Sequence, residues 1–324
     1  MNFFMDNIDW LLPYLDNLSF TRISVKFTPI SDLAQKAWIG AAVRNRFLQA
    51  AEKVMLSEGM TLREKLDTLP LSEDHFLYNQ FKGGFPKGYM FDVSRLSSAK
   101  SSFELKADET YRLDLLLIGT MDSLQPQMIT ALQTMLSDGL GNPPVQLMLQ
   151  EMKIEKSVSL RNFAKRNFEG PVTGEFRLRT PLSLLKPLKN TSHVSYQAKM
   201  NGFPSFYQWM NAAVNRLMAL TLLYSEDHLS VIDTREEWER SIENFVFPAA
   251  DAWLTEAGLR FRKLRSTPKQ GEVNVYVMSG YVGNMTYSGI SPFHVPVVGL
   301  MSQLGVGNDI NFGLGKYDVD FTEI

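Results

Sequence analysis

Strand-like and helical hydrophobic patterns succeed one another along the chain in an order that narrowly constrains the fold. Apolar and polar residues alternate in the stretches typical of strands, and apolar residues recur at helical spacing in the stretches between them. In the first half of the chain, the strand-like stretches are 19–27, 89–93, 111–119 and 145–156, and the helical stretches are 31–59 and 125–139. The order is therefore β-α-β-β-α-β, which is the ferredoxin-like arrangement.

The second half repeats this order with one additional helix. Its strand-like stretches are 174–180, 259–264, 272–282 and 317–321, and its helical stretches are 205–224, 234–247 and 291–304. We therefore predict an α+β fold of two tandem ferredoxin-like (RRM-like) domains, each an antiparallel sheet with helices on one face. The stretch "NFEGPVTG" concentrates turn-forming residues. We accordingly expect an N-terminal domain at 1–160 and a C-terminal domain at 170–324.

Composition restricts the chemistry available to the chain. Its 324 residues, 44% of them hydrophobic, are enough to build two cores. The absence of cysteine removes disulfides, thiolate metal ligands and cysteine nucleophiles, and it suits a reducing compartment. The N-terminus is acidic, unlike a signal peptide, and no apolar run reaches the length of a membrane span. We expect a cytoplasmic protein with no membrane partner, no cofactor and no metal, since neither a metal-ligand spacing nor a nucleotide-binding fingerprint is present.

Four glycines lie close together in "LGVGNDINFGLGKYDVDF" (304–321). Glycine allows left-handed backbone conformations and removes the side chain that would keep a phosphate at a distance. The stretch is thus either a phosphate-binding backbone surface or a turn that packs closely between two domains. For the first interpretation, the candidate RNA-binding residues are Gly305, Gly307, Asn308, Gly313, Gly315 and Lys316.

Positive charge is concentrated in "RFRKLRSTPK" (260–269), which contains no acidic residue although the net charge of the chain is only −2. The run is strand-like and precedes a predicted hairpin turn. It is either an RNA-binding surface or an ordinary solvated strand, and repulsion among its cations favours RNA because phosphates would relieve it. The candidate RNA-binding cations are Arg260, Arg262 and Arg265, with Lys263 on the opposite face.

Two further features have weaker functional interpretations. A second basic cluster, Arg177, Arg179, Lys186 and Lys189, could line a groove between the domains or belong to ordinary surface. His294 is the histidine nearest in sequence to the glycine stretch, and a structural hydrogen bond to a backbone carbonyl is the favoured role for it.

Together, the glycine stretch, the repeated element order and several local strings resemble the CRISPR-associated endoribonucleases of the RAMP superfamily, which cut long CRISPR transcripts into guide RNAs. These enzymes are similar in having two ferredoxin-like domains and a C-terminal loop of the form G-x-G-x(4–5)-G-x-G. This chain has Gly305, Gly307, Gly313 and Gly315 at those positions. In addition, "IGAAVRNRF" (39–47) resembles the Gly-x-x-Leu/Val-Arg string of the family's first helix.

The resemblance implies that CRISPR repeat RNA is the partner, with other CRISPR-associated effector subunits as further candidates. It also implies metal-independent cleavage, in which the ribose 2′-OH attacks the adjacent phosphate and leaves a 2′,3′-cyclic phosphate. Many members place a histidine near the first helix, whereas no histidine precedes His75 in this chain. Lys36 and Arg44, eight residues apart on the predicted first helix, and Lys26, before it, are therefore the candidate catalytic residues for charge stabilisation or proton transfer.

Two alternatives to an RNA-cutting enzyme follow from the same features. One is a RAMP-superfamily subunit that binds guide RNA without cutting it, which the missing N-terminal histidine favours. The other is a ferredoxin-like regulatory module that binds a small ligand and no RNA. The sequence is compatible with a monomer or a homodimer.

Overall fold

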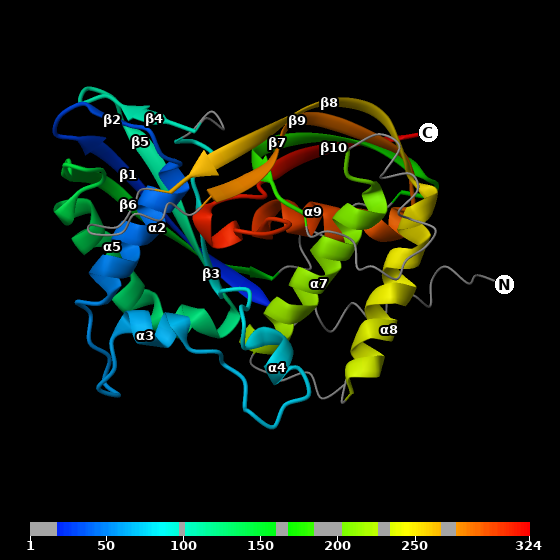
Figure 1. The fold of residues 1–324 in the computed structure, drawn as a ribbon, viewed down its shortest axis with the longest axis horizontal. Helices are drawn as coiled ribbons and strands as arrows, with labels where there is room; N and C mark the ends of the chain where they lie inside the picture. Colours follow the sequence, from blue (N-terminus) through cyan, green and yellow to red (C-terminus); the bar gives the residue numbers. More distant parts are fainter. Residues whose placement is uncertain (1–17, 97–100, 160–167, 185–202, 226–233, 267–276) are drawn as a thin grey trace.

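The computed structural model describes residues 18–96, 101–159, 168–184, 203–225, 234–266 and 277–324, and it contains two four-stranded antiparallel sheets (Figure 1). Both sheets have the strand order of a ferredoxin-like unit, so the predicted fold class is confirmed. No helix among these residues combines the length and apolar composition that a bilayer span requires.

The first sheet has the order β3-β5-β1-β6. Helices α2 and α5 cover one face of it, where they pack on alternating strand residues such as Ile23, Val25 and Leu115. The strands are β1 (Ser19–Pro29), β3 (Tyr89–Asp92), β5 (Tyr111–Ile118) and β6 (Leu147–Ser159), and the helices are α2 (Ile39–Ala51) and α5 (Gln125–Asp138).

The second sheet has the order β10-β7-β9-β8, with three helices on one face. The strands are β7 (Val172–Leu182), β8 (Trp253–Arg265), β9 (Val277–Ile290) and β10 (Tyr317–Glu323), and the helices are α7 (Phe206–Tyr224), α8 (Arg235–Val246) and α9 (Val295–Leu304). Phe206 and Trp209 are fully buried, as expected for the apolar face of α7.

Smaller elements connect these units. A two-stranded sheet pairs β2 with β4, and short helices lie in the connections. These elements are β2 (Leu33–Gln35), β4 (Phe103–Leu105), α3 (Leu62–Asp67), α4 (Tyr78–Phe81), and the 3₁₀ turns η1 (Gly119–Leu124), η3 (Phe247–Asp251), η4 (Pro292–His294) and η5 (Ile310–Phe312).

The predicted start of the first helix is wrong. Residues 33–35 form β2, and α2 begins only at Ile39, after Trp38. The carboxylate of Asp32 does not cap a helix but accepts a hydrogen bond from the backbone N–H of Ala107, 2.9 Å away, which ties this segment to the chain beyond β4. Lys36 therefore precedes α2 and does not share a helical stripe with Arg44.

One hydrophobic core extends across both sheets. Phe20, Met90 and Leu116 lie on the face of the first sheet opposite α2, and they belong to the same buried cluster as the residues of α7 and α9. The helices of the second half thus cover part of the first sheet's remaining face. The two sheets use residues 19–159 and 172–323, and on this separation we propose the division into domains at 160–170.

Candidate nucleic-acid interface

The glycine loop, residues 305–316, has the backbone conformation that its sequence predicts. Gly305, Gly307, Gly313 and Gly315 have φ angles of 74°, 97°, 76° and 75°, in the region that L side chains rarely adopt. Asp309 also has a positive φ, of 58°.

Many N–H groups of this loop, however, are already engaged by hydrogen bonds within the protein. They donate to oxygens of α9, of the loop itself and of the end of β7. The bonds are Gly305 N to Met301 O (2.7 Å), Val306 N to Gly315 O (3.0 Å), Asn308 N to Ser183 O (2.6 Å), Gly313 N to Ile310 O (2.8 Å), Gly315 N to Pro181 O (2.9 Å) and Lys316 N to Thr180 Oγ1 (2.9 Å).

Close packing explains the glycines themselves. A Cβ atom on Gly307 or Gly315 would overlap a backbone carbonyl oxygen, and one on Gly313 would lie 2.7 Å from Cγ2 of Val93. The burial of Gly305, Gly313 and Gly315 favours the alternative of a closely packed turn over a phosphate surface at these positions. Gly307 and Asn308 are half-buried, and their contact with RNA stays a prediction.

Lys316 is also buried, with 4% of its surface exposed. Its Nζ donates to the carbonyl of Gln303 and lies 3.6 Å from Oδ2 of Asp92. Burial lowers the pKa of Lys316, and the Asp92 carboxylate opposes that shift. Because the last carbonyls of a helix lack intrahelical partners, Lys316 caps the C-terminus of α9. Lys316 thus has partners within the protein, and its contact with a phosphate stays a prediction.

The glycine loop contacts the start of α2. Nε1 of Trp38 donates to the carbonyl of Phe312 at 2.7 Å, and the guanidinium of Arg44 lies 4.5 Å from the centre of the Phe312 ring. Gly40 faces the same carbonyl, where a Cβ atom would overlap the oxygen. The Gly-x-x-Val-Arg string thus has a structural reason: Gly40 admits the loop, and Arg44, one turn later, stacks on it.

The end of β8 reaches the same junction. The backbone N–H of Trp38 donates to the carbonyl of Arg265 at 2.9 Å, and Leu264 is buried in the core beneath α2. This places the end of β8 beside the segment that carries exposed Lys36, two residues before Trp38. The structure therefore brings together at Trp38 the segments that carry Lys36, Arg44 and Arg265.

Lys26 does not join this group. In β1, Ile23, Val25 and Phe27 face α2, so Lys26 lies on the opposite face of the sheet. There its Nζ is 2.6 Å from Oε2 of Glu151. The three candidate catalytic residues predicted from the sequence therefore do not lie together, because Lys26 lies apart from Lys36 and Arg44.

The cations of β8 are open to solvent. Arg260, Arg262, Lys263 and Arg265 are all exposed, and none is paired with a carboxylate in the described part of the chain. Arg95, which follows β3 near Gly313, is a further exposed cation that the sequence analysis did not single out. The hairpin tip, 267–276, lies outside the described residues.

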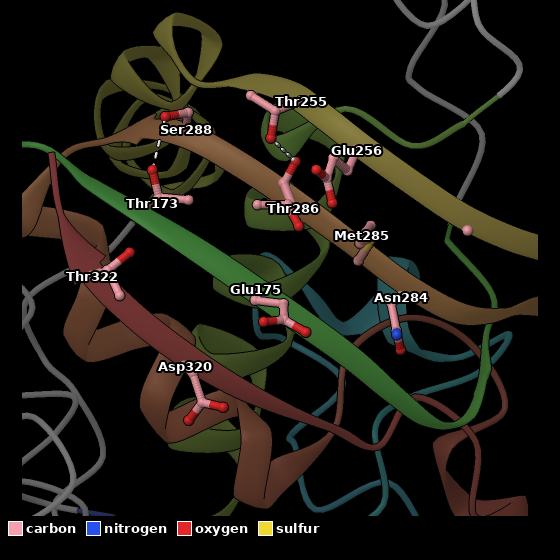
Figure 2. Close-up of a pocket in the computed structure, with 11 residues that line it drawn as sticks. Thr173, Glu175, Thr255, Glu256, Asn284, Met285, Thr286, Ser288, Asp320 and Thr322 are labelled. Carbon is pink, nitrogen blue, oxygen red and sulfur yellow. Dashed lines mark hydrogen bonds between the residues drawn. The ribbon is translucent and has the colours of Figure 1, made fainter.

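The second basic cluster is neutralised where it is described. Arg177 and Arg179 on β7 form ion pairs with Asp320 and Asp318 of the adjacent strand β10. Figure 2 shows Glu175, Glu256 and Asp320 on the same open face of this sheet. The face is therefore more acidic than the prediction of a basic groove required. Lys186 and Lys189 lie outside the described residues.

His294 has the structural role favoured by its sequence context. It is fully buried, and its Nε2 lies 3.0 Å from the carbonyl oxygen of Phe245. Burial lowers the pKa of His294 to about 4, so the ring is neutral at physiological pH. It therefore cannot contact RNA. His193 and His228 lie outside the described residues.

The described residues thus combine paired ferredoxin-like sheets, a C-terminal glycine loop seated on α2, and exposed cations on β8. A scan of protein-family models and a search of curated proteins found no match. Solved structures, in contrast, match over nearly the whole chain.

The solved structures that match include Cas6 proteins. A Cas6 product complex aligns with a TM-score of 0.53 at 16% identity, covering 93% of this chain and 100% of that one. Thermus thermophilus Cas6 aligns with a TM-score of 0.51 at 13% identity, covering 94% and 99%. A partial Cas6-RT-Cas1–Cas2 complex gives 0.54 at 13% identity, where 95% of this chain spans 47% of that chain. At such identities the likeness shows the fold, and at that level the predicted resemblance is confirmed.

Proposed function

We propose that this protein binds CRISPR repeat RNA and cuts the precursor transcript within the repeat. The observation that carries the proposal is that β8, whose exposed cations have no carboxylate partner among the described residues, ends at the contact between α2 and the glycine loop. Trp38, two residues after exposed Lys36, is hydrogen-bonded there to the carbonyl of Arg265. The Cas6 fold supports the choice of RNA, because the solved structures that share it include a Cas6 product complex.

The cations of β8 would supply most of the affinity. Unpaired cations side by side repel one another, and an RNA backbone neutralises them while releasing its own counterions. Such contacts position RNA without reading its bases. The glycine loop would act indirectly, by fixing the position of α2 where it meets the end of β8.

Cleavage would proceed by attack of a ribose 2′-OH on its own phosphate. Lys36, which is exposed, and Arg44, which is held on the Phe312 ring, would stabilise the charge that develops on the phosphate oxygens. Nε of Arg44 is buried without a hydrogen-bond partner among the described residues. We assign these residues charge stabilisation and not proton transfer.

The test is a cleavage assay on repeat RNA from the neighbouring CRISPR array, with EDTA present. We expect products with 2′,3′-cyclic phosphate and 5′-OH ends. The variant Arg44→Ala should cut about 100-fold more slowly, which is the usual effect of removing one transition-state donor. Arg177→Ala is the matched control, because that arginine is already paired with Asp320, and it should cut at the wild-type rate. Absence of any repeat-RNA binding would overturn the proposal.

A second candidate function is guide-RNA binding without cutting. It is favoured by the described histidines, since His294 is buried away from the junction and His75 lies beside α4. In that case the cleavage assay would give no cyclic-phosphate product, whereas a binding measurement would show salt-sensitive retention of repeat RNA that is weakened in Arg260→Ala and in Arg262→Ala. A small-ligand regulatory module would retain no RNA at all.

A further inference from the structure

A large aromatic side chain is exposed in the middle of the basic strand. Phe261 lies between Arg260 and Arg262, and 55% of its surface is exposed to solvent. Exposing a phenyl ring forgoes the burial that normally stabilises such a residue. Its position in the sequence and its exposure therefore call for an explanation other than core packing.

The ring of Phe261 is held in place from one side. Its cross-strand partner in β9 is Tyr281, and the two ring centres are 5.4 Å apart at an interplanar angle of 71°. Tyr281 is in turn 6.3 Å from the ring of Phe203, also edge-to-face. Phe261 is thus supported by an aromatic neighbour while much of its surface stays open.

The two faces of β8 carry different side chains, and basic residues lie on both. Side chains alternate along a strand, so Phe261 and Lys263 share one face while Arg260 and Arg262 share the other. β8 is the outer strand of its sheet, and the β7–β9 pairing becomes irregular between Leu178 and Leu182, opposite this segment. A ligand can therefore contact both faces of the strand.

We infer that Phe261, supported by Tyr281, is a stacking platform for an unpaired base of the bound RNA, with the neighbouring cations holding the adjacent phosphates. This inference rests on the proposed function and specifies its substrate: the RNA is single-stranded where it crosses β8. Interleaved aromatic and basic side chains suit single strands, because every unpaired base offers a π-face for stacking while a duplex hides its bases from this contact.

The experiment measures binding of fluorescently labelled repeat RNA by anisotropy over a series of salt concentrations. We expect Phe261→Ala to weaken binding about 10-fold to 100-fold, while Phe261→Trp retains most of the affinity. The dependence of log K on log salt should not change in Phe261→Ala, because no charge is lost. In Arg262→Ala the slope should fall by about 0.7, the value for one phosphate contact on a single strand.

Phe247 provides the matched control. It is also a phenylalanine exposed to solvent, at 71%, but it lies in η3, which precedes the start of β8, whereas the cations lie toward the other end of that strand. Phe247→Ala should bind RNA like the wild type. A 2-aminopurine base placed at successive repeat positions should lose fluorescence at one position on binding, and the loss should disappear in Phe261→Ala.

The outcomes separate this inference from the proposed function. If the wild type binds repeat RNA and Phe261→Ala binds it equally well at every salt concentration, the stacking role is overturned and the proposed function stands. Equal affinity for a fully paired duplex would also overturn it. If the wild type binds no repeat RNA, the proposed function fails first, and the stacking role fails with it.

Discussion

The glycine loop and strand β8 look alike as sequence signals for RNA, yet the structure treats them in opposite ways. Many N–H groups of the loop are hydrogen-bonded within the protein, and Lys316 is buried against Asp92. β8 leaves its cations and Phe261 in solvent, with no carboxylate partner in the part of the chain that is described. In the loop, protein atoms pair with the backbone donors and with the charge of Lys316, whereas the cations and the phenyl ring of β8 are left open to a ligand.

This difference indicates which of the two regions is open to a ligand. A glycine cluster indicates only that the backbone adopts unusual conformations or is closely approached by other atoms. Those atoms can belong to the protein as well as to a phosphate. Cations that remain unpaired after folding are either ordinary solvated surface or available to a ligand. In this structure the loop sets the junction, and β8 is the element that we propose binds RNA.

The largest effect should come from closing the space into which the loop docks. A Cβ atom on Gly40 would overlap the carbonyl oxygen of Phe312 and lie 2.6 Å from Nε1 of Trp38, so it would break their hydrogen bond. Adding the usual costs of overpacking and of a lost hydrogen bond, we expect Gly40→Ala to lower the free energy of unfolding by about 4 kcal/mol. Urea denaturation measures this directly.

Gly83 offers the control for this substitution. A Cβ atom there meets nothing within 4 Å, so Gly83→Ala should change the free energy of unfolding by less than about 0.5 kcal/mol. Equal stability of the two variants would mean that the loop does not dock on α2 as described.

A somewhat smaller effect concerns the start of α9, the helix that leads into the loop. The pKa of His294 is lowered by burial to about 4, against 6.5 for the unperturbed side chain. A lowered histidine pKa means that the unfolded chain binds the proton more readily, so stability is complete above pH 6.5 and falls as the pH drops toward 4. The loss should reach about 3 kcal/mol in the acid limit.

The variant His294→Leu tests the assignment. It should be less stable than the wild type at neutral pH by about 1 kcal/mol, because the carbonyl of Phe245 loses its partner. Its decline between pH 6.5 and 4 should be shallower than that of the wild type. An unchanged decline would assign the acid sensitivity to another group.

Much of the fold could be predicted because its elements are long and periodic. α5 and α7 carry continuous helical patterns with clear ends, such as Gly139 after α5, whose φ is 85°. The β2–β4 sheet was not predicted, because three-residue strands are too short to establish a period. Their pairing also depends on residues far apart in the sequence, and for the same reason the start of α2 was misplaced.

The candidate site could be predicted only in part. The cations of β8 could be identified from the sequence, because a run of basic residues in a strand can be recognised without knowledge of its tertiary contacts. Trp38 and Phe312 could not be found, because their roles arise from a contact between the two ends of the chain. The pairing of Lys316 was missed for the converse reason: its partner Asp92 is distant in the sequence, so it appeared to be an unpaired charge.

A structural cation can be distinguished from a binding one by its effect on stability. Replacing Lys316 by Met leaves Asp92 without its partner and removes the cap of α9, so the free energy of unfolding should fall by about 2 kcal/mol. The double variant Asp92→Asn/Lys316→Met should recover part of that loss, since no unpaired charge is then left. Arg262→Ala, in contrast, should stay within about 0.5 kcal/mol of the wild type in stability and lose RNA affinity instead. The comparison between the loop and β8 is broken if Lys316→Met folds with wild-type stability while the salt dependence of its RNA binding decreases, because Lys316 would then be a phosphate contact after all.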